Sequence, residues 1–436
     1  MPIGCYCWLT EEEIAAIDWT QFDPDAEMGY ILEVDLEYPP HLHLAHNSLP
    51  LAPHKMDITE DTISPFSREC LQQTRGKTVH QSSKLVSTFL PRVKYAVHAA
   101  NLALYLQLGM KLVKGHRVLS FEQSNFLGKY IDSCTRRRAE AKTAFRKNIH
   151  KSFSNCNYGK FIEDKRQHLE VEICTTKEHF ERCVENPRFV SFKVISTSGI
   201  VAAFLKPRRI LMDQAWAIGF TILERSKEMI FDHYYNIIRP ALDNNCSVVF
   251  TDTDSLCLRV VAPLSKEQVL DRLEPVMDYS NYDKSHPRYD TSRANRPKYW
   301  KDELSGKTMA EFVGLSSKCY SYRVLDDSGA AAVTKNKCKG VTKVVRSRIP
   351  FDEYKKCVTG ISKHVVGQCR IESKNHTIRV VSTEKRAISS FDDKRYVFNC
   401  NIHTAAYGSA LINASRGAPG TCPFCEYWSA SYGQKK

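Results

Sequence analysis

The sequence contains no apolar run long enough to span a bilayer, and its first residues, Met1-Pro-Ile-Gly4, show no signal-peptide pattern. We therefore expect no membrane span and an intracellular location, in the nucleus or the cytoplasm. Internal repeats and low-complexity tracts are also missing. With 42% hydrophobic and 25% charged residues, the 436 residues predict a globular chain of two or three domains.

Acidic residues are fewer than basic ones. The chain has 49 Asp and Glu residues against 62 Lys and Arg residues, which gives a formal net charge of +13. The sequence pI is about 9.0. This balance favours an acidic partner, with nucleic acid as the first candidate.

The cysteines lack the dense spacing of a disulfide framework, although there are 16 of them. Many lie inside apolar runs, which is typical of buried thiols in a reducing compartment. Only Cys5 with Cys7, and Cys422 with Cys425, are closely spaced. Cys422-Pro-Phe-Cys425 is a Cys-x-x-Cys pair, but no second such pair lies nearby in the sequence. A zinc site is therefore the less favoured interpretation of this pair.

Residues 246–261 contain the clearest candidate for chemistry. Two apolar, β-branched runs flank Thr251-Asp-Thr-Asp254, which predicts a β-hairpin with two carboxylates at its turn. Two like charges so close together are costly unless they are neutralised, and Mg²⁺ ions are suitable for this. Asp252 and Asp254 are thus candidate metal ligands for phosphoryl or nucleotidyl transfer. From these residues alone, a solvated surface turn remains the alternative.

The most basic region lies between residues 126 and 166. Helix formers without Pro or Gly run from Tyr130 to about His150, so we expect one helix there. On this helix Arg138 and Lys142 are four residues apart and would share a face.

A second helical stretch carries Lys151, Asn155 and Tyr158 at i, i+4 and i+7, again on one face. An ordinary pair of solvated basic helices is one interpretation. The functional alternative is a pair of facing helices that offers Arg and Lys to a triphosphate, with Tyr158 beside the base.

The remaining pattern predicts helices and strands in mixed order. We expect a capped helix after Thr10, a strand at 29–38, a loop-like segment at 41–92, a helix at 93–108, a strand at 110–121, mostly strands at 167–212, a helix at 214–238 and a strand at 312–322. Because strand residues alternate between faces, the last strand would place Lys318 and Tyr320 on the same side.

Together, four short motifs resemble those of family B DNA polymerases. Phe250-Thr-Asp-Thr-Asp-Ser255 is similar to the family's Tyr-x-Asp-Thr-Asp-Ser motif, and Lys151-Ser-Phe-Ser-Asn-Cys-Asn-Tyr-Gly159 to its fingers motif, Lys-x₃-Asn-Ser-x-Tyr-Gly. Lys318-Cys-Tyr320 resembles the Lys-x-Tyr motif that grips primer–template, and Arg138-x₃-Lys142 fits the other fingers helix. The match covers roughly residues 1–410 and looks most like the protein-primed branch of phages, linear plasmids and Polinton-like transposons.

The resemblance implies an α+β right-hand fold with a palm sheet, helical fingers and a small thumb, and without the exonuclease domain. The implied division is an N-terminal palm strand and insertion at 1–121, fingers at 122–166, an insertion subdomain at 167–212, palm with the Asp-Thr-Asp hairpin at 213–330, thumb at 331–412 and a flexible tail at 413–436.

The resemblance also implies a DNA-directed DNA polymerase that uses two Mg²⁺ or Mn²⁺ ions held by Asp252 and Asp254. Its partners would be DNA primer–template, dNTPs and a terminal priming protein. The implied nucleotide-binding residues are Arg138, Lys142, Lys151, Asn155 and Tyr158, and the implied DNA-binding residues are Lys318 and Tyr320.

The family's first catalytic motif, Asp-x-x-Ser-Leu-Tyr-Pro, has no good match. Glu33-Val-Asp-Leu-Glu-Tyr-Pro39 has Glu33 where the family has Asp, and no Ser-Leu precedes Tyr38. Met1-Pro-Ile-Gly4 resembles a turn that follows this motif in relatives. We therefore expect the chain to begin downstream of the first catalytic aspartate, with Asp35 as the less favoured third ligand. The loss of a bridging carboxylate would leave the isolated chain weakly active or inactive.

Two other functions remain open at this stage. A non-catalytic remnant of a mobile-element polymerase would keep the basic helices and still bind primer–template DNA, with an affinity that depends on salt. An Asp-x-Asp glycosyltransferase would use Mn²⁺ and a nucleotide sugar, but it would have no use for the helix at 151–159.

Overall fold

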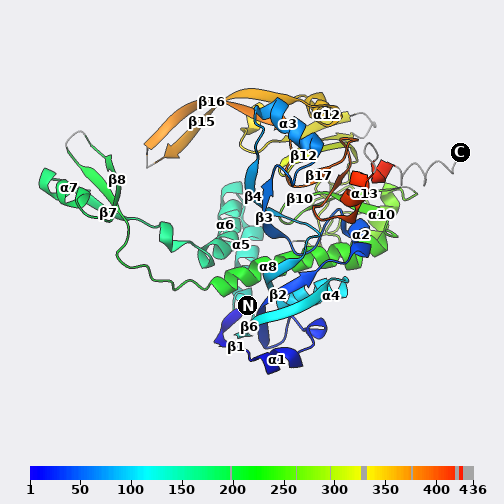
Figure 1. Ribbon diagram of the computed structural model, residues 1–436, viewed down its shortest axis with the longest axis horizontal. Helices are drawn as coiled ribbons and strands as arrows, with labels where there is room; N and C mark the ends of the chain where they lie inside the picture. The colour runs from blue at the N-terminus through cyan, green and yellow to red at the C-terminus, as the bar shows by residue number, and fades with distance from the viewer. Residues whose placement is uncertain are drawn as a thin grey trace. The chain divides into compact units, whose positions relative to one another are not determined.

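The computed structural model describes residues 1–196, 199–261, 263–294, 296–325, 331–374, 377–417 and 422–425 (Figure 1). The chain is α+β, as predicted. It divides into two compact units. The larger unit comprises Cys5–Phe121, Glu224–Arg370 and Val381–Lys436, and the smaller comprises Met1–Gly4, Glu122–Leu223 and Ile371–Val380. None of the described helices combines the length and the apolar character that crossing a bilayer requires.

The main sheet of the larger unit has four strands in the order β1-β6-β2-β5. Their bounds are Pro2–Trp8 (β1), Met28–Glu37 (β2), Arg92–His98 (β5) and Lys111–Gln123 (β6). On β2, Leu32, Val34 and Leu36 are almost completely buried, while the acidic residues between them are partly exposed. This alternation places the apolar face of β2 in the main hydrophobic core.

Helices complete this core. Helix α1 (Glu11–Ala16) begins with a capping box formed by Thr10 and Glu13, as the sequence predicts for Thr10. The larger unit also contains α2 (His43–His46), α4 (Ala99–Gln107), the part of α8 (Trp216–Asp232) from Glu224 onward with its π-helical continuation His233–Ile238, and α9 (Arg239–Ala241). Tyr234 and Tyr235, from the π-helical turn, are buried in the same core as β2.

The chain then forms a series of antiparallel hairpins and short helices. The strands are β10 (Cys246–Thr251), β11 (Leu256–Val260), β12 (Met309–Ser316), β13 (Cys319–Leu325), β14 (Ala331–Lys337), β15 (Lys363–Lys374), β16 (Thr377–Ser389), β17 (Tyr396–Val397) and β18 (Thr404–Ala405). The helices are α10 (Lys266–Leu273), α11 (Lys343–Arg346), α12 (Phe351–Thr359) and α13 (Ala410–Gly417).

A second hydrophobic cluster lies in the larger unit. It combines β3 (His54–Thr59), α3 (Pro65–Arg75) and β4 (Gln81–Val86) with residues that are distant in the sequence, including Phe398 and Cys422. The sequence prediction of a loop-like segment at 41–92 is therefore wrong. Helix α3 starts with Ser64 as its N-cap and Pro65 in its first turn, and it buries Leu71, so its own pattern is amphipathic.

The smaller unit contains two long helices, α5 (Gly128–Glu140) and α6 (Ala144–Phe161). It also holds a three-stranded sheet in the order β7-β9-β8, formed by Glu170–Cys174, Val201–Leu205 and Phe189–Val194, and the helix α7 (Lys177–Val184). Cys174 and Cys183 are buried in the small core between α7 and this sheet. The strand predicted around Phe189 is confirmed.

Two other predicted helices differ from the structure. The predicted helix at 93–108 begins only at Ala99, because residues 92–98 pair with β2 as the strand β5. The predicted helix from Tyr130 to about His150 breaks after Glu140, where Ala141 is extended and Thr143 caps α6 by accepting a hydrogen bond from the Arg146 N–H. In both cases the local apolar pattern fitted a helix, and pairing or capping decided the boundary.

The strand predicted at 312–322 is two strands. β12 ends at Ser316 and β13 begins at Cys319, so Ser317 and Lys318 form a tight hairpin turn. Lys318 has a left-handed backbone, with φ of 59°. The alternation argument for Lys318 and Tyr320 is therefore wrong, because Lys318 is a turn residue.

Candidate active site on the β10–β11 hairpin

The predicted β-hairpin around the two aspartates is confirmed. β10 pairs antiparallel with β11, with Thr251 opposite Leu256 and Phe250 opposite Cys257. The Asp252 N–H donates to the Ser255 carbonyl at 3.3 Å and closes the turn. The Asp254 side chain is exposed and the Asp252 side chain is half-buried. The turn thus presents two carboxylates together at its tip.

Thr253, between the two aspartates, has a left-handed backbone with φ of 63°. This region is disfavoured for a β-branched residue. Its hydroxyl donates to Asp252 Oδ1 at 3.3 Å. The hydroxyl of Ser255 donates to the Asp252 carbonyl at 3.2 Å. These local bonds help to hold the strained turn in place.

Lys318 lies beside the first of the two aspartates. Its Nζ is 2.8 Å from Asp252 Oδ1, although the two residues belong to different hairpins. The hydrogen bond from Lys318 is the largest cause that lowers the pKa of Asp252, and the charge of Lys337 lowers it further. Lys337 lies in the basic segment Lys335–Gly340 of the sequence and was not predicted as a site residue. The pairing of β13 with β14 brings Lys337 to the site, because it places this residue opposite Tyr320.

Tyr320 fixes the two hairpins to each other through an aromatic stack. Its ring lies 4.4 Å from that of Phe250, at an interplanar angle of 25°. Phe312 of β12 stacks on Phe250 at 5.3 Å, nearly parallel at 10°. Tyr320 is 9% exposed, and burial raises the pKa of its hydroxyl to about 12. Tyr320 therefore supports the turn that carries Lys318, and its hydroxyl is neutral at physiological pH.

The residues weighed as a third metal ligand have other partners. Asp35 accepts a hydrogen bond from the Lys94 N–H at 2.7 Å and lies 2.8 Å from His116 Nε2. Glu33 Oε2 lies 2.9 Å from Arg117 Nε. The pKa of Asp35 is lowered, first by the Lys94 N–H and then by His116, and that of Glu33 by the hydrogen bond from Arg117. Both carboxylates therefore already have polar partners on strands of their own sheet.

Asp252 and Asp254 alone supply the acidic donors at the turn. Within the described part of the chain, no third His, Cys, Asp or Glu side chain joins them in a group whose ligand atoms all lie within 4.8 Å of one another. Carboxylate oxygens at an exposed turn are suitable donors for Mg²⁺ or Mn²⁺. The donor set fits such an ion, with its remaining positions left for water or phosphate oxygens.

The predicted nucleotide-binding residues lie on and between the two long helices of the smaller unit. Lys151, Asn155 and Tyr158 share one face of α6, as predicted. Arg138 lies near the end of α5, but Lys142 lies in the break between the helices, so the prediction that these two share a helix face is wrong.

These side chains are available to solvent. Arg138, Lys142, Lys151 and Asn155 are exposed, and Tyr158 is half-buried. Among the salt bridges between described residues, none involves Arg138, Lys142 or Lys151. The helices are joined by a hydrogen bond from the Tyr130 hydroxyl to the Phe153 carbonyl at 3.3 Å. Arg138, Lys142 and Lys151 therefore have no acidic partner within the described part of the chain.

Comparison with known proteins gives structural likenesses only. No family model and no curated protein sequence matches the chain. Among solved structures, the chain is similar to phi29 DNA polymerase in an orthorhombic crystal form, with a TM-score of 0.49 and 13% identity over 84% of this chain and 52% of that one. It is also similar to phi29 DNA polymerase complexed with primer–template DNA, with a TM-score of 0.46 and 12% identity over 88% and 54%.

A third likeness is to phi29 DNA polymerase complexed with primer–template DNA and incoming nucleotide substrates. Its TM-score is 0.43 and its identity 12%, over 87% of this chain and 63% of that one. The chain thus spans between 52% and 63% of the length of these polymerase chains. Identities of 12–13% and TM-scores below 0.5 transfer no function to this chain, whose function is therefore inferred from its own residues.

Proposed function

We propose that this chain is the core of a DNA-directed DNA polymerase of the family B type, which binds primer–template DNA and dNTPs. One observation carries the proposal. The Asp-Thr-Asp turn and the Lys-Cys-Tyr segment, which resemble two motifs of that family, meet in the structure through the Lys318–Asp252 ion pair and the Tyr320–Phe250 stack. Among the branches of the family, the sequence motifs favour the protein-primed one.

Asp252 and Asp254 would hold Mg²⁺ or Mn²⁺ at the hairpin turn. When bound, such an ion acts as a Lewis acid toward phosphoryl oxygens. The Lys318 ammonium neutralises Asp252 in its absence and would be free to contact a DNA phosphate once Asp252 binds a cation. Tyr320 keeps the Lys318 turn at this distance from the carboxylates by its stack on Phe250.

On the helix pair, Arg138, Lys142 and Lys151 would bind the triphosphate, because their charges are exposed and have no acidic partner among the described residues. Asn155 and Tyr158 follow on the face of Lys151 and would contact the base pair that forms. The formal net charge of +13 supports an anionic partner of this kind.

A second candidate is a protein that binds primer–template DNA without catalysis. It is favoured by one observation: Asp35 and Glu33 are paired with His116 and Arg117, and no third carboxylate accompanies Asp252 and Asp254 among the described residues. Two-metal nucleotidyl transfer needs a bridging ligand from each side of the site, and loss of such a contact commonly costs about two or more orders of magnitude in rate.

Primer extension on a gapped DNA template separates the two candidates. The full chain is assayed in Mn²⁺ and then in Mg²⁺, beside Asp254→Ala and the control Asp61→Ala, which removes another exposed turn aspartate. Incorporation that Asp254→Ala abolishes and Asp61→Ala retains supports the polymerase. Salt-sensitive DNA binding without incorporation supports the binding protein. Absence of both activities would sink the proposal.

A further inference from the structure

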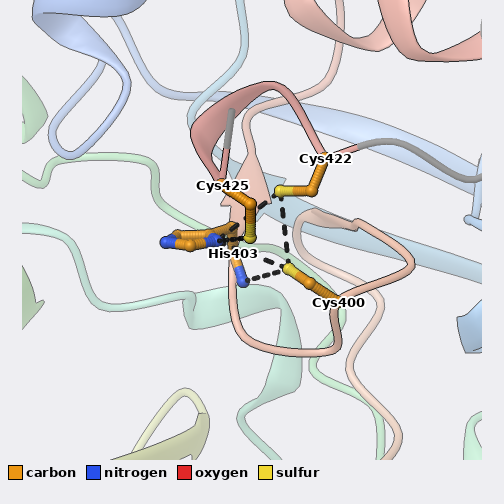
Figure 2. Close-up of side chains that lie close together, drawn as sticks. All are labelled: Cys400, His403, Cys422 and Cys425. Carbon is orange, nitrogen blue, oxygen red and sulfur yellow. Dashed lines mark hydrogen bonds between the residues drawn. The ribbon is translucent and has the colours of Figure 1, made fainter. Parts of the chain in front are cut away.

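Four metal-binding side chains converge near the C-terminal end of the described chain. Cys400 and His403 lie on the turn between β17 and β18, and Cys422 and Cys425 lie on a short helical segment that follows α13. Figure 2 shows the four side chains pointing toward one another. Their ligand atoms all lie within 4.8 Å of one another. We propose that these four residues bind one Zn²⁺ ion in a structural site.

The distances between the ligand atoms are slightly shorter than those of a zinc tetrahedron. Cys400 Sγ and Cys422 Sγ are 3.4 Å apart. The Nδ1 atom of His403 is 3.4 Å from Cys400 Sγ, 3.5 Å from Cys422 Sγ and 3.4 Å from Cys425 Sγ. A tetrahedral zinc with ordinary bond lengths separates two sulfurs by about 3.8 Å and a sulfur from a nitrogen by about 3.6 Å. A modest expansion of the group would therefore accommodate the ion.

The sequence spacing agrees with this geometry. Cys400-Asn-Ile-His403 and Cys422-Pro-Phe-Cys425 each place two ligands three residues apart, as in structural zinc sites. The His403 N–H donates to Cys400 Sγ at 3.3 Å, which favours the thiolate form that binds metal. Three sulfurs and one imidazole form a soft donor set that selects zinc over Mg²⁺ or Ca²⁺.

Aromatic side chains pack against the group. The Phe424 ring lies 5.5 Å from the His403 imidazole, at an interplanar angle of 25°. Phe398 lies 5.8 Å from Phe424 and is 2% exposed. Cys422 is 5% exposed and belongs to the second hydrophobic cluster. Four protein ligands and an apolar wall describe a closed site with a structural role, because a catalytic zinc keeps one position open.

A disulfide explains the group less well. A Cys400–Cys422 disulfide would involve only two of the three sulfurs. It would not explain why Cys425 and His403 lie beside them. All four side chains are instead arranged around one point, and each sulfur contacts the same imidazole nitrogen. Bound zinc would tie residues 422–425 to the β17–β18 turn, and its binding free energy would add to the stability of this cluster.

The buried pair Cys174 and Cys183 provides an internal comparison. With His179 these cysteines form a second group, which has three ligands only. His179 Nε2 is 3.2 Å from Glu172 Oε2 and is thereby occupied. Variants of Cys174 therefore distinguish the proposed site from this second group of possible ligands.

Metal content tests the proposal independently of any polymerase activity. The full chain is produced with zinc in the medium, dialysed and analysed by mass spectrometry of the metal. We expect about one Zn²⁺ per chain in the wild type, in Cys174→Ser and in Cys70→Ser, which removes a buried thiol of the same hydrophobic cluster. Cys425→Ser and His403→Gln should retain less than about a tenth of the wild-type zinc. Because Cys425 is exposed, its replacement should leave the fold intact.

Cobalt gives a second readout. Co²⁺ added to the chelator-treated wild type should produce the visible bands of a tetrahedral thiolate site, and Cys425→Ser should not produce them. A chelator should lower the Tm of the wild type but not that of Cys425→Ser. Wild-type protein without zinc and without cobalt bands would overturn the proposal, as would zinc that Cys425→Ser keeps and Cys174→Ser loses.

Discussion

Lys318 and Asp252 form an ion pair across two hairpins, with 2.8 Å between Nζ and Oδ1. The pair neutralises one of two adjacent carboxylates without any bound ion. It also means that a cation at Asp252 has to displace an ammonium group, which then becomes available to another anion. If the turn binds a metal as proposed, Lys318 would couple that metal to a neighbouring phosphate.

Replacement of Lys318 tests this coupling. Lys318→Gln should weaken primer–template binding. It should also make the slope of log K against log[salt] less steep by about 0.9, because one phosphate contact is lost. The measurement is fluorescence anisotropy over a series of salt concentrations. Lys55→Gln removes an exposed charge from β3 and serves as the control. Equal slopes for wild type and Lys318→Gln would exclude a phosphate contact by Lys318.

The exposed face of α6 that carries Lys151 is the proposed binding surface for the dNTP triphosphate. Lys151→Gln should weaken dNTP binding about tenfold, because a charge-assisted hydrogen bond to the triphosphate is lost. Arg146→Gln makes the same change of charge about 140° around the same helix and should have little effect. Binding is measured by titration calorimetry in the presence of primer–template. A similar loss in both variants would indicate a general effect of charge.

The stack between Phe250 and Tyr320 should contribute to stability. In a double-mutant cycle of Phe250→Leu and Tyr320→Leu, we expect a coupling of about 0.5–1.5 kcal/mol, because the rings lie 4.4 Å apart. The free energy of unfolding is measured with urea for the wild type and the three variants. Strictly additive effects would mean that the two hairpins are held together by other contacts.

Asp392 predicts an unusual dependence of stability on pH. Burial, with the nearby charge of Asp393, raises the pKa of Asp392 to about 6. The unfolded chain gives up this proton near pH 4, so ionisation costs stability as pH rises from about 4 to 6. Asp392→Asn should therefore be more stable than the wild type at pH 7, and the difference should vanish below about pH 4. Urea unfolding between about pH 3 and pH 7 measures this.

Asp393 provides a control of opposite sign. Burial alone would raise its pKa, but the ammonium of Lys84, 2.6 Å from Oδ2, outweighs burial and lowers it. Its contribution is present above about pH 4 and is lost as pH falls through the lowered pKa. Asp393→Asn should therefore destabilise the protein at pH 7. If the Asn variants at positions 392 and 393 changed the free energy of unfolding in the same direction at pH 7, the pKa directions given for both aspartates would be contradicted.

The sequence alone predicted features that depend on neighbours in the chain. The Asp-Thr-Asp hairpin, the Thr10 cap and the shared face of Lys151, Asn155 and Tyr158 follow from local spacing, and all three are present. The break after Glu140 was missed because Lys142 follows good helix formers, and no Gly or Pro marks the end of the helix.

Features set by distant partners were not predicted. The strand β5 looks helical by itself and is a strand because it pairs with β2. The convergence of Cys422 and Cys425 with Cys400 and His403 was not predicted, because the sequence holds no second Cys-x-x-Cys pair nearby and the partner pair contains a histidine. Only the fold of the β17–β18 turn brings the pairs together. The tail predicted at 413–436 remains a prediction for the residues outside the described segments.

Thr253 makes the tip of the β10–β11 hairpin a point of local frustration. A β-branched residue in a left-handed backbone costs about 1–3 kcal/mol, and glycine would avoid most of this cost. The chain instead keeps a hydroxyl there, bonded to Asp252 Oδ1, the same oxygen that Lys318 contacts. The backbone conformation therefore favours glycine at this position, whereas the hydrogen bond to Asp252 needs the threonine hydroxyl. Selection for thermal resistance alone would drive this position toward glycine, while selection for the acidic turn would preserve the threonine.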